Sequence, residues 1–315
     1  MNIKLKIPDS FFFGEERCGY YVSPEMKRVW AVMLDLIAEF QRVCEKHNLK
    51  WWMDGGTLLG AARHKGFIPW DDDVDVIMMR DDYSRFCEIA PDEFSSPYRI
   101  TTHETEEFGR LMPMSKLSNE ETTILENHTL SYMEQGIRPS YSQGIYIDIF
   151  PLDDLPDNEA EAKRFIHRLR KTCLKSFKLM RWTDLYTPAK KSWKKPIKAA
   201  LHYVCSRLNL SHANYRKFLD DIEANRHPHS QRVAKTVFIN DQKFEARRIW
   251  NRSWFDDTVY LPFEMFSLPA PAGYTDVLDK FYGNWRKYFI RVAHGGFYDT
   301  ERPYTYYMQE GHIPE

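Results

Sequence analysis

Acidic side chains and paired glycines occur together in residues 52–76, and they suggest two kinds of chemistry. Gly55 and Gly56 precede a segment of helical character, and the N-terminus of a helix attracts phosphate. The acids of residues 71–75 lead into an apolar stretch, and clustered carboxylates attract hard divalent cations. A site with both features is suited to a nucleotide together with its metal ion.

The alternation of side chains along a β-strand separates these acids into two groups. Asp73 and Asp75 share one face of the strand expected over residues 73–79, whereas Asp72 points to the other face. Two carboxylates about 4 Å apart repel by about 4 kcal/mol at an effective dielectric constant of about 20, so the pair needs a cation. Magnesium suits such oxygen ligands.

Asp148 is a lone carboxylate in the apolar segment 145–150. A buried unpaired charge is costly, so Asp148 needs a partner. If its strand lies beside residues 73–79, three carboxylates converge on one metal site. The alternatives are a solvated turn at residues 71–73, an arginine or backbone amide as the partner of Asp148, and a turn without phosphate at the two glycines. The three features together favour the metal and nucleotide site.

The elements that must position these residues alternate between helix and strand and then become mostly strand, which suits an α/β (α+β) domain with a mixed sheet. A helix should begin at Ser23-Pro24-Glu25 and end near residue 48. Thr57 is expected to cap the next helix, and Pro151 and Pro156 are expected to end the strands. The expected strands cover residues 50–53, 73–79, 98–102, 111–117, 122–125, 145–150 and 260–264, and the later helices cover 57–64, 81–90 and 274–281.

A basic segment follows this core. Residues 157–226 look helical, and residues 163–207 carry 14 Lys and Arg against one acid, which leaves the remainder of the chain near −14. Basic amphipathic helices lie on anionic membrane surfaces, but a solvated face or contact with the acidic remainder is nearly as well supported. Nucleic-acid binding is not expected, because no reader motif accompanies the charge. We divide the chain into residues 1–156 (core), 157–235 (basic helices) and 236–315 (a C-terminal part that packs on the core, with an extended tail from residue 297).

The composition fits a soluble globular protein of 315 residues with 43% hydrophobic and 28% charged residues. Five scattered cysteines without CxxC spacing indicate neither a disulfide framework nor a zinc site. The N-terminus lacks a signal-peptide layout, and no apolar run is long enough to span a membrane. We therefore expect a cytoplasmic protein, with peripheral contact at the inner face of the membrane as the extension suggested by the basic segment.

Residues 54–76, Asp-Gly-Gly-Thr-Leu-Leu-Gly-Ala-Ala-Arg-His-Lys-Gly-Phe-Ile-Pro-Trp-Asp-Asp-Asp-Val-Asp-Val, closely resemble the signature of the LicD family. These phosphocholine transferases are related to fukutin-type phosphotransferases and have a nucleotidyltransferase-like fold. Residues 145–153 match the family's second motif, and residues 259–263, 271–274 and 278–283 look like its C-terminal motif. The run after Tyr282-Gly283 departs from the family pattern, which leaves the acceptor open.

The resemblance implies roles for individual residues. Asp73, Asp75 and Asp148 would bind Mg²⁺ (or Mn²⁺) and form the catalytic centre. The donor phosphates would be held by Gly55, Gly56 and Thr57. Candidate phosphate contacts, for each of which an ordinary surface role is equally open, are Arg63, His64, Lys65 and Lys116.

The resemblance also implies a reaction. Phosphocholine, or a related phospho-substituent, would pass from CDP-choline or a similar CDP-linked donor to a hydroxyl of a cell-surface glycan, free or lipid-linked, such as lipopolysaccharide or teichoic acid, with release of CMP. Two alternatives use the same residues differently. A DxD-type glycosyltransferase would use a nucleotide-sugar donor, and a noncatalytic glycan-binding scaffold would keep only the fold.

Overall fold

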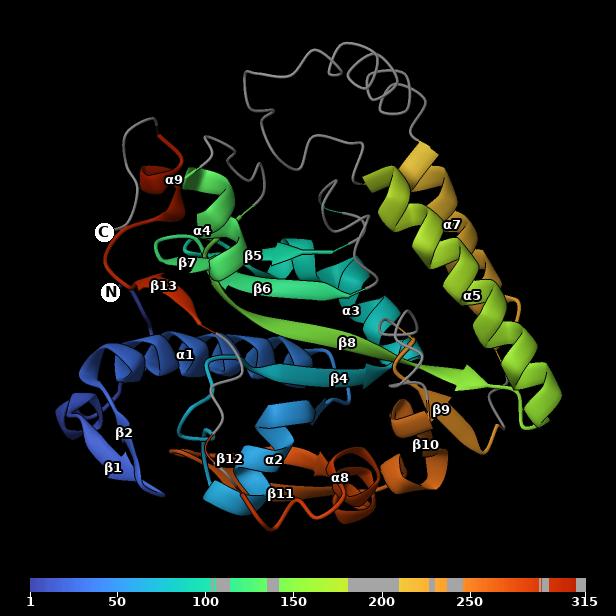
Figure 1. The fold of residues 1–315 in the computed structure, drawn as a ribbon, viewed down its shortest axis with the longest axis horizontal. Helices are drawn as coiled ribbons and strands as arrows, with labels where there is room; N and C mark the ends of the chain where they lie inside the picture. Colours follow the sequence, from blue (N-terminus) through green and yellow to red (C-terminus); the bar gives the residue numbers. More distant parts are fainter. Residues whose placement is uncertain are drawn as a thin grey trace.

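The computed structural model describes residues 1–102, 105, 114–134, 142–180, 210–226, 230–236, 246–288, 290 and 295–309. It confirms the predicted fold class, a mixed β-sheet flanked by helices (Figure 1). Much of the predicted basic segment, residues 181–209, lies outside the described residues, as does the end of the predicted tail, residues 310–315. In the part of the chain that is described, no helix combines the length and apolar character needed to cross a bilayer.

The central sheet has seven strands in the order β10-β9-β8-β4-β3, with β6 beside the first part of β8 and β5 beside β6. Among the described strands of this sheet, β4 and β8 run parallel and the other pairs are antiparallel. Its strands are β3 (Trp52–Met53), β4 (Asp75–Met79), β5 (Tyr98–Thr101), β6 (Ser115–Asn119), β8 (Ile145–Leu155), β9 (Arg232–Ala234) and β10 (Ile249–Asn251). In the described part of the chain, three two-stranded antiparallel pairs lie outside it. They are β1 (Glu15–Arg17) with β2 (Tyr20–Val22), β7 (Thr123–Glu126) with β13 (Gly296–Asp299), and β11 (Thr258–Phe263) with β12 (Phe266–Pro271).

The helices begin and end close to their expected positions. The Ser23 hydroxyl accepts a hydrogen bond from the Met26 amide at 3.3 Å, which caps the first helix as predicted. The helices are α1 (Pro24–Lys46), α2 (Gly55–His64), α3 (Arg80–Glu93), α4 (Asn127–Glu134), α5 (Glu159–Met180), α7 (Leu210–Glu223), α8 (Tyr274–Tyr282) and α9 (Tyr304–Tyr307). Short 3-10 turns cover Asp9–Phe12, Ala246–Arg248 and Arg252–Phe255. Two expectations were wrong in detail: α2 begins at Gly55 rather than after a Thr57 cap, and the tail contains the short helix α9.

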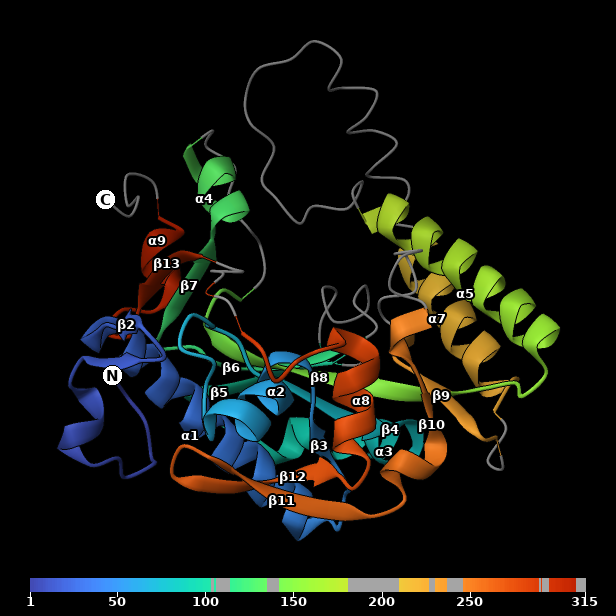
Figure 2. The ribbon, with the colours of Figure 1, turned by 60° about the horizontal axis from the view of Figure 1, so that its bottom comes forward.

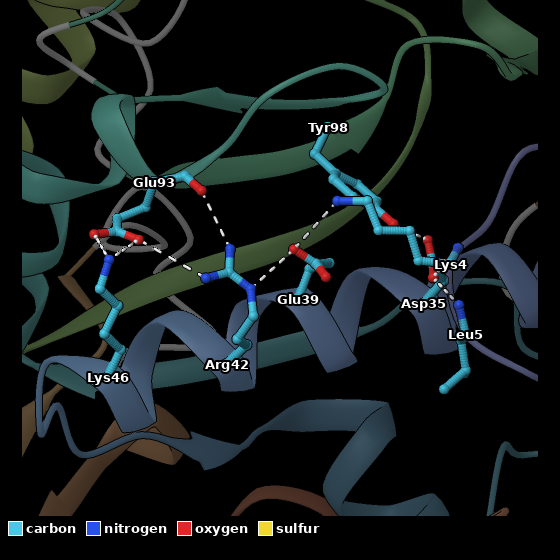
Figure 3. Close-up of polar contacts among 8 residues, drawn as sticks. All are labelled: Lys4, Leu5, Asp35, Glu39, Arg42, Lys46, Glu93 and Tyr98. Atoms are coloured by element: carbon cyan, nitrogen blue, oxygen red, sulfur yellow. Dashed lines mark hydrogen bonds and ion pairs between the residues drawn. The ribbon is translucent and has the colours of Figure 1, made fainter.

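A polar network fixes α1 to its surroundings (Figure 3). The buried Asp35 carboxylate accepts hydrogen bonds from the Lys4 and Leu5 amides at 2.9 and 2.8 Å, and from the Tyr98 hydroxyl at 2.7 Å. Burial raises the pKa of Asp35, and these three donors oppose that rise. At the other end of α1, Lys46 pairs with Glu93 at 2.8 Å and so joins α1 to α3.

Strand β8 continues through Pro151 to Leu155, so the prediction that this proline ends the strand was wrong. The Asp148 amide donates to Val74 of β4 at 2.9 Å, and amide directions alternate along a strand, so position 151 faces away from β4. On that side β6 pairing stops at Ile149 and β9 pairing starts at Asp153. Pro151 therefore needs no hydrogen-bond donor where it lies.

Helices α5 and α7 pack side by side at one end of the sheet in both views (Figures 1 and 2). They enclose a small apolar cluster that is separate from the main core and that also includes Leu155 of β8 and Ala234 of β9. Arg168 of α5 and Asp221 of α7 form an ion pair at 3.4 Å across the helix pair. The division of the chain at residues 156 and 235 stays a prediction.

Candidate active site

Strand register brings three of the predicted site residues into one row. Asp75 of β4 is the register partner of Asp148 of β8, and Asp148 is in turn the partner of Lys116 of β6. Directly paired residues on neighbouring strands point to the same face of a sheet. The two acids, about seventy residues apart in the chain, therefore lie side by side, as their positions in apolar strands predicted.

We call Asp75, Asp148 and the nearby Asp73 the acid row. It lies on the face of the sheet that α3 does not cover. On the opposite face, Ser115 is the partner of Ile149, and the Ser115 hydroxyl contacts the Tyr83 hydroxyl of α3 at 2.8 Å. Because neighbouring residues alternate between faces, Lys116 and Asp148 point away from α3. The helices that cover one face thus leave the acids accessible on the other.

Strand β4 begins at Asp75 rather than at the predicted residue 73, but burial still alternates from Asp71 to Val76 as the predicted strand would require. Asp73 and Asp75 are half-buried, whereas Asp72, which precedes them, and Val74, which lies between them, are buried. Asp72 accepts a hydrogen bond from the hydroxyl of Tyr298 in β13. Asp72 therefore anchors the C-terminal region instead of joining the acid row.

Gly55 and Gly56 allow the acids to lie over the N-terminus of α2. Gly55 has φ +52°, and a Cβ atom there would lie 2.8 Å from Oδ2 of Asp75. A Cβ atom at Gly56 would lie 2.5 Å from Oδ2 of Asp71. Side chains larger than hydrogen would push the carboxylates away, so the spacing of glycines and acids is required by close approach as well as by backbone conformation.

Thr57 connects the same loop to the strand. Its buried hydroxyl accepts a hydrogen bond from the Asp75 amide at 2.9 Å. The Asp54 amide donates to the Asp75 carbonyl at 3.0 Å. Thr57 thus holds the start of β4 against α2, and any role in phosphate binding stays a prediction.

Lys235, which directly follows β9, enters the site and was not expected there. Its ammonium forms a buried ion pair with Asp54, lies 4.0 Å from Oδ2 of Asp75, and lies 3.4 Å from the ring centroid of Phe150. Nothing in the local sequence distinguishes Lys235 from other lysines. It reaches the acids only because β9 extends the sheet beside the last part of β8.

Lys116 supplies a cation at the other end of the row. Its ammonium lies 3.1 Å from Oδ1 of Asp148 and 3.3 Å from the ring centroid of Tyr146. The structure therefore brings this predicted phosphate contact to the acids. With Lys235, it gives the site two ammonium groups that compensate the carboxylates.

A cavity of about 200 Å³ opens beside these residues. One wall carries carboxylates and the two glycines; the other is mostly aromatic and apolar and comes from the C-terminal part of the chain. The lining residues are Asp54, Gly55, Gly56, Leu58, Asp71, Asp73, Asp75, Lys235, Arg248, Trp250, Val277, Leu278, Phe281 and Tyr282. Acids, cations and rings around one small space suit a ligand with charged and apolar parts.

Asp75 resists ionisation. Burial raises the pKa of Asp75 well above its usual range, and the charges of Asp73 and Asp148 raise it further, while Lys235 opposes the rise. A cation bound beside Asp75 would favour the carboxylate form. The electrostatics of the site therefore favour added positive charge.

Arg63 and Lys65 lie away from this cavity. They sit at the C-terminal end of α2, a ten-residue helix that spans about 15 Å. The Arg63 guanidinium donates to the Trp285 carbonyl at 2.8 Å, and Lys65 adopts a left-handed conformation as the C-cap. Burial and the neighbouring Arg63 lower the pKa of His64 to about 4, so this ring is neutral at pH 7. These residues contact the C-terminal part of the chain, and their predicted role as phosphate contacts gains no support from their position.

The residue types of the acid row fit a magnesium or manganese ion. Asp73, Asp75 and Asp148 offer hard oxygen donors, and the charge at the buried Oδ1 of Asp148 is compensated by the Lys116 ammonium. Within the described ranges, no three acid, histidine or cysteine side chains already stand in a coordinating arrangement. An ion would therefore require the carboxylates to turn toward one another, and the metal site stays a prediction.

The comparisons with known proteins agree with this geometry. Residues 48–189 match the family described as "LicD/FKTN/FKRP, nucleotidyltransferase domain". The chain is 24% identical over 265 residues to the lipopolysaccharide cholinephosphotransferase LicD of Haemophilus influenzae, an alignment that covers 81% of this chain and 89% of that protein.

Shorter matches extend to other organisms. The human ribitol 5-phosphate transferase FKRP is 48% identical over 46 residues, which is 15% of this chain and 9% of that protein. An uncharacterised Rickettsia prowazekii protein, RP689, is 41% identical over 124 residues, or 38% of this chain and 44% of that protein. The part of the chain that carries the acid row's Asp73, Asp75 and Asp148 and the glycine loop is therefore similar to the nucleotidyltransferase domain of the LicD/FKTN/FKRP family.

Proposed function

We propose that this protein transfers phosphocholine, or a related phospho-substituent, from a CDP-linked donor to a hydroxyl of a cell-surface glycan and releases CMP. The observation that carries the proposal is the register pairing of Asp75 with Asp148 beside the N-terminus of α2. That pairing places Asp148 beside Asp75, and Asp75 lines one cavity together with the phosphate-attracting N-terminus of α2. The similarity to a lipopolysaccharide cholinephosphotransferase supports phosphocholine and a glycan as the two substrates.

The donor pyrophosphate would lie at the N-terminus of α2. Gly55 and Gly56 leave space there, and the helix end favours negative charge. Lys235 and Arg248, both on the cavity wall, add positive charge. A divalent cation held by Asp73, Asp75 and Asp148 would supply charge neutralisation to the pyrophosphate.

Transfer requires an oxygen nucleophile and a place for its proton. The acceptor hydroxyl oxygen forms a bond to the phosphorus that bears choline, the bond from that phosphorus to the bridging oxygen breaks, and CMP leaves with the electron pair. We assign proton removal to Asp148, because its carboxylate lies beside that of Asp75 and its Oδ1 is held by an ion pair. Lys116, at 3.1 Å from that oxygen, keeps the carboxylate oriented.

A quaternary ammonium is recognised by aromatic faces. The rings that line the cavity are Trp250, Phe281 and Tyr282. By contrast, Trp51 and Trp52 are buried in the main core, and Lys116 covers the ring of Tyr146. The cavity rings are thus the ones we propose for the choline group.

The test is to incubate the purified protein with magnesium and one donor at a time, namely CDP-choline, CDP-ribitol or UDP-glucose, and to measure the released nucleotide. CMP from CDP-choline, increased by cell-envelope glycan, is expected. Turnover of CDP-ribitol alone would change the substituent. Release of UDP from UDP-glucose without CMP from either CDP donor would replace the proposal with a glycosyltransferase.

Peripheral contact with anionic membrane is a separate part of the proposal, and it rests on the net charge of +13 in residues 163–207. Such contact would bring the enzyme to a lipid-linked acceptor. Co-sedimentation with vesicles that contain anionic lipid should decrease as salt increases. Equal binding to neutral vesicles would contradict this electrostatic account.

A further inference from the structure

A second, larger cleft adjoins the small cavity and shares Trp250 with it. It has a volume of about 700 Å³ and runs between the start of α5, strands β9 and β10, and α8. Figure 2 shows β9 and β10 between α8 and the N-terminal end of α5. Its lining residues are Asp157, Glu159, Ala162, Lys163, Ile166, Gln231, Arg232, Ile249, Trp250, Asn251, Trp254 and Lys280. Trp250 lines both this cleft and the smaller cavity, so the two spaces adjoin.

The acids of the cleft are engaged within the protein. Asp157 accepts hydrogen bonds from the Ser230 hydroxyl at 3.0 Å and the Gln231 amide at 2.8 Å. Glu159 pairs with Lys163 at 2.6 Å. Asp157 therefore joins the segment before α5 to the segment before β9, whereas Glu159 balances Lys163 within α5.

Arg232 and Lys280 remain as positive charges facing the cleft. Among the described residues, no carboxylate forms an ion pair with either side chain, and Arg232 reaches only the Asp157 carbonyl, at 3.5 Å. Partial burial lowers the pKa of Lys280, and the nearby charge of Arg232 lowers it further. Two cations that repel each other favour an anion between them.

The aromatic wall provides a flat surface and a hydrogen-bond donor. The indole N–H of Trp250, a side chain only 2% exposed, has no hydrogen-bond partner within the described residues. Trp254 is held in place because Gly273 has no side chain: a Cβ atom there would lie 2.6 Å from the Cβ of Trp254. The Lys280 ammonium lies 5.9 Å from the centroid of the Trp254 ring. A ring beside cations suits a sugar that carries a negative group.

We propose that this cleft is the acceptor site and that it binds an anionic sugar, with the ring over Trp254 and a phosphate or carboxylate between Arg232 and Lys280. The role of the cleft as an acceptor site rests on the proposed function, whereas the binding of an anionic sugar can be tested without any transfer. The cleft shares Trp250 with the smaller cavity, so a sugar in the cleft would lie next to the proposed donor site. The cleft therefore selects for acceptors that already carry negative charge.

Isothermal titration at low salt tests the binding with three probes: mannose 6-phosphate, mannose and inorganic phosphate. We expect mannose 6-phosphate to bind more tightly than either of the others, because only it uses both the ring and the cations. Mannose 6-phosphate and CDP-choline should bind together without competition. Equal binding of mannose, equal binding of inorganic phosphate, or competition with CDP-choline would overturn the assignment.

The variants Arg232→Gln and Lys280→Gln should each lower the affinity for mannose 6-phosphate about tenfold, the loss expected for one charge-assisted contact. Lys6→Gln removes an equal charge at an exposed position and should leave the affinity unchanged. Binding of CDP-choline should be preserved in all three variants, because none of the three side chains lines the smaller cavity. If CDP-choline fails while mannose 6-phosphate still binds through Arg232 and Lys280, the proposed function is wrong and the sugar site stands. Unchanged mannose 6-phosphate affinity in both cleft variants would contradict the site.

Discussion

The two walls of the small cavity come from regions with very different sequence signals. Residues 54–75 form one wall, where glycines and acids follow one another at short spacing and their roles follow from local rules. Residues 235–282 form the other wall, where a lysine, an arginine and several rings are scattered among ordinary residues. The residues proposed for phosphate and metal are close together in the sequence. The residues that supply the compensating charge and the apolar surface come together only in the folded chain.

The largest effect is expected on the first wall. Asp75→Asn should lower turnover about 10³-fold, or ~4 kcal/mol, because the row loses a charge that a metal ion requires. The same change should raise the melting temperature in EDTA at pH 8, since burial raises the pKa of Asp75 and its ionisation therefore disfavours the folded state.

The stability gain has a defined pH dependence. The gain should disappear as pH falls below about 3.9, where the carboxyl is protonated in both the folded and the unfolded chain. Asp92→Asn, at an exposed position in α3, is the control and should change neither property. Full activity of Asp75→Asn would remove Asp75 from the catalytic centre.

The second wall is tested by Lys235→Met. This change should lower the free energy of unfolding by about 3–5 kcal/mol in urea titrations, because it leaves the buried Asp54 carboxylate without its partner. Adding Asp54→Asn should restore much of that loss. A single variant as stable as the parent protein would mean that the second wall contributes no electrostatic support to the first.

The glycine loop can be tested with a matched pair. Gly19 and Gly55 both have positive φ, but a Cβ atom at Gly19 meets nothing within 4 Å, whereas one at Gly55 meets Asp75. Both alanine variants should lose about 1 kcal/mol from backbone strain. Gly55→Ala should lose a further ~1 kcal/mol or more from overpacking, together with activity. Identical thermal stability and turnover in the two variants would show that the close approach to Asp75 is unimportant.

The smallest effect concerns Asp72, which lies between two acids of the first wall but does not line the cavity. Tyr298→Phe removes the hydrogen bond to Asp72 and should cost about 1.5 kcal/mol of unfolding free energy. Because Asp72 faces away from the acid row, kcat should stay near that of the parent protein. A large decrease in kcat with normal stability would place Asp72 in the catalytic centre after all.

Sequence rules predicted the parts of the site that depend on strand alternation and on apolar surroundings. Asp73, Asp75 and Asp148 were proposed as site residues because a carboxylate in an apolar strand needs a compensating partner. The register of the sheet places Lys116 beside Asp148. Lys235, Arg248 and Trp250 could not be found in this way, because their places depend on β9 joining the edge of β8.

The failures have equally local causes. Arg63 and Lys65 were grouped with the phosphate site because they are near the glycines in sequence, but a ten-residue helix carries them to its far end. The length of β8 was underestimated because the effect of a proline in a strand depends on whether a neighbouring strand faces its nitrogen. Both require knowledge of what lies beside the segment.

The position of Pro151 also restricts how β8 can pair. Shifted by one residue, β8 would turn the proline nitrogen toward a β4 carbonyl and carry Asp148 to the face covered by α3. Shifted by two, it would bring the proline opposite β6 or β9, where an amide donor is needed. Every misaligned pairing loses a hydrogen bond that the native alignment does not require. Pro151, which has no part in the chemistry, thus favours the strand register that places Asp75 beside Asp148.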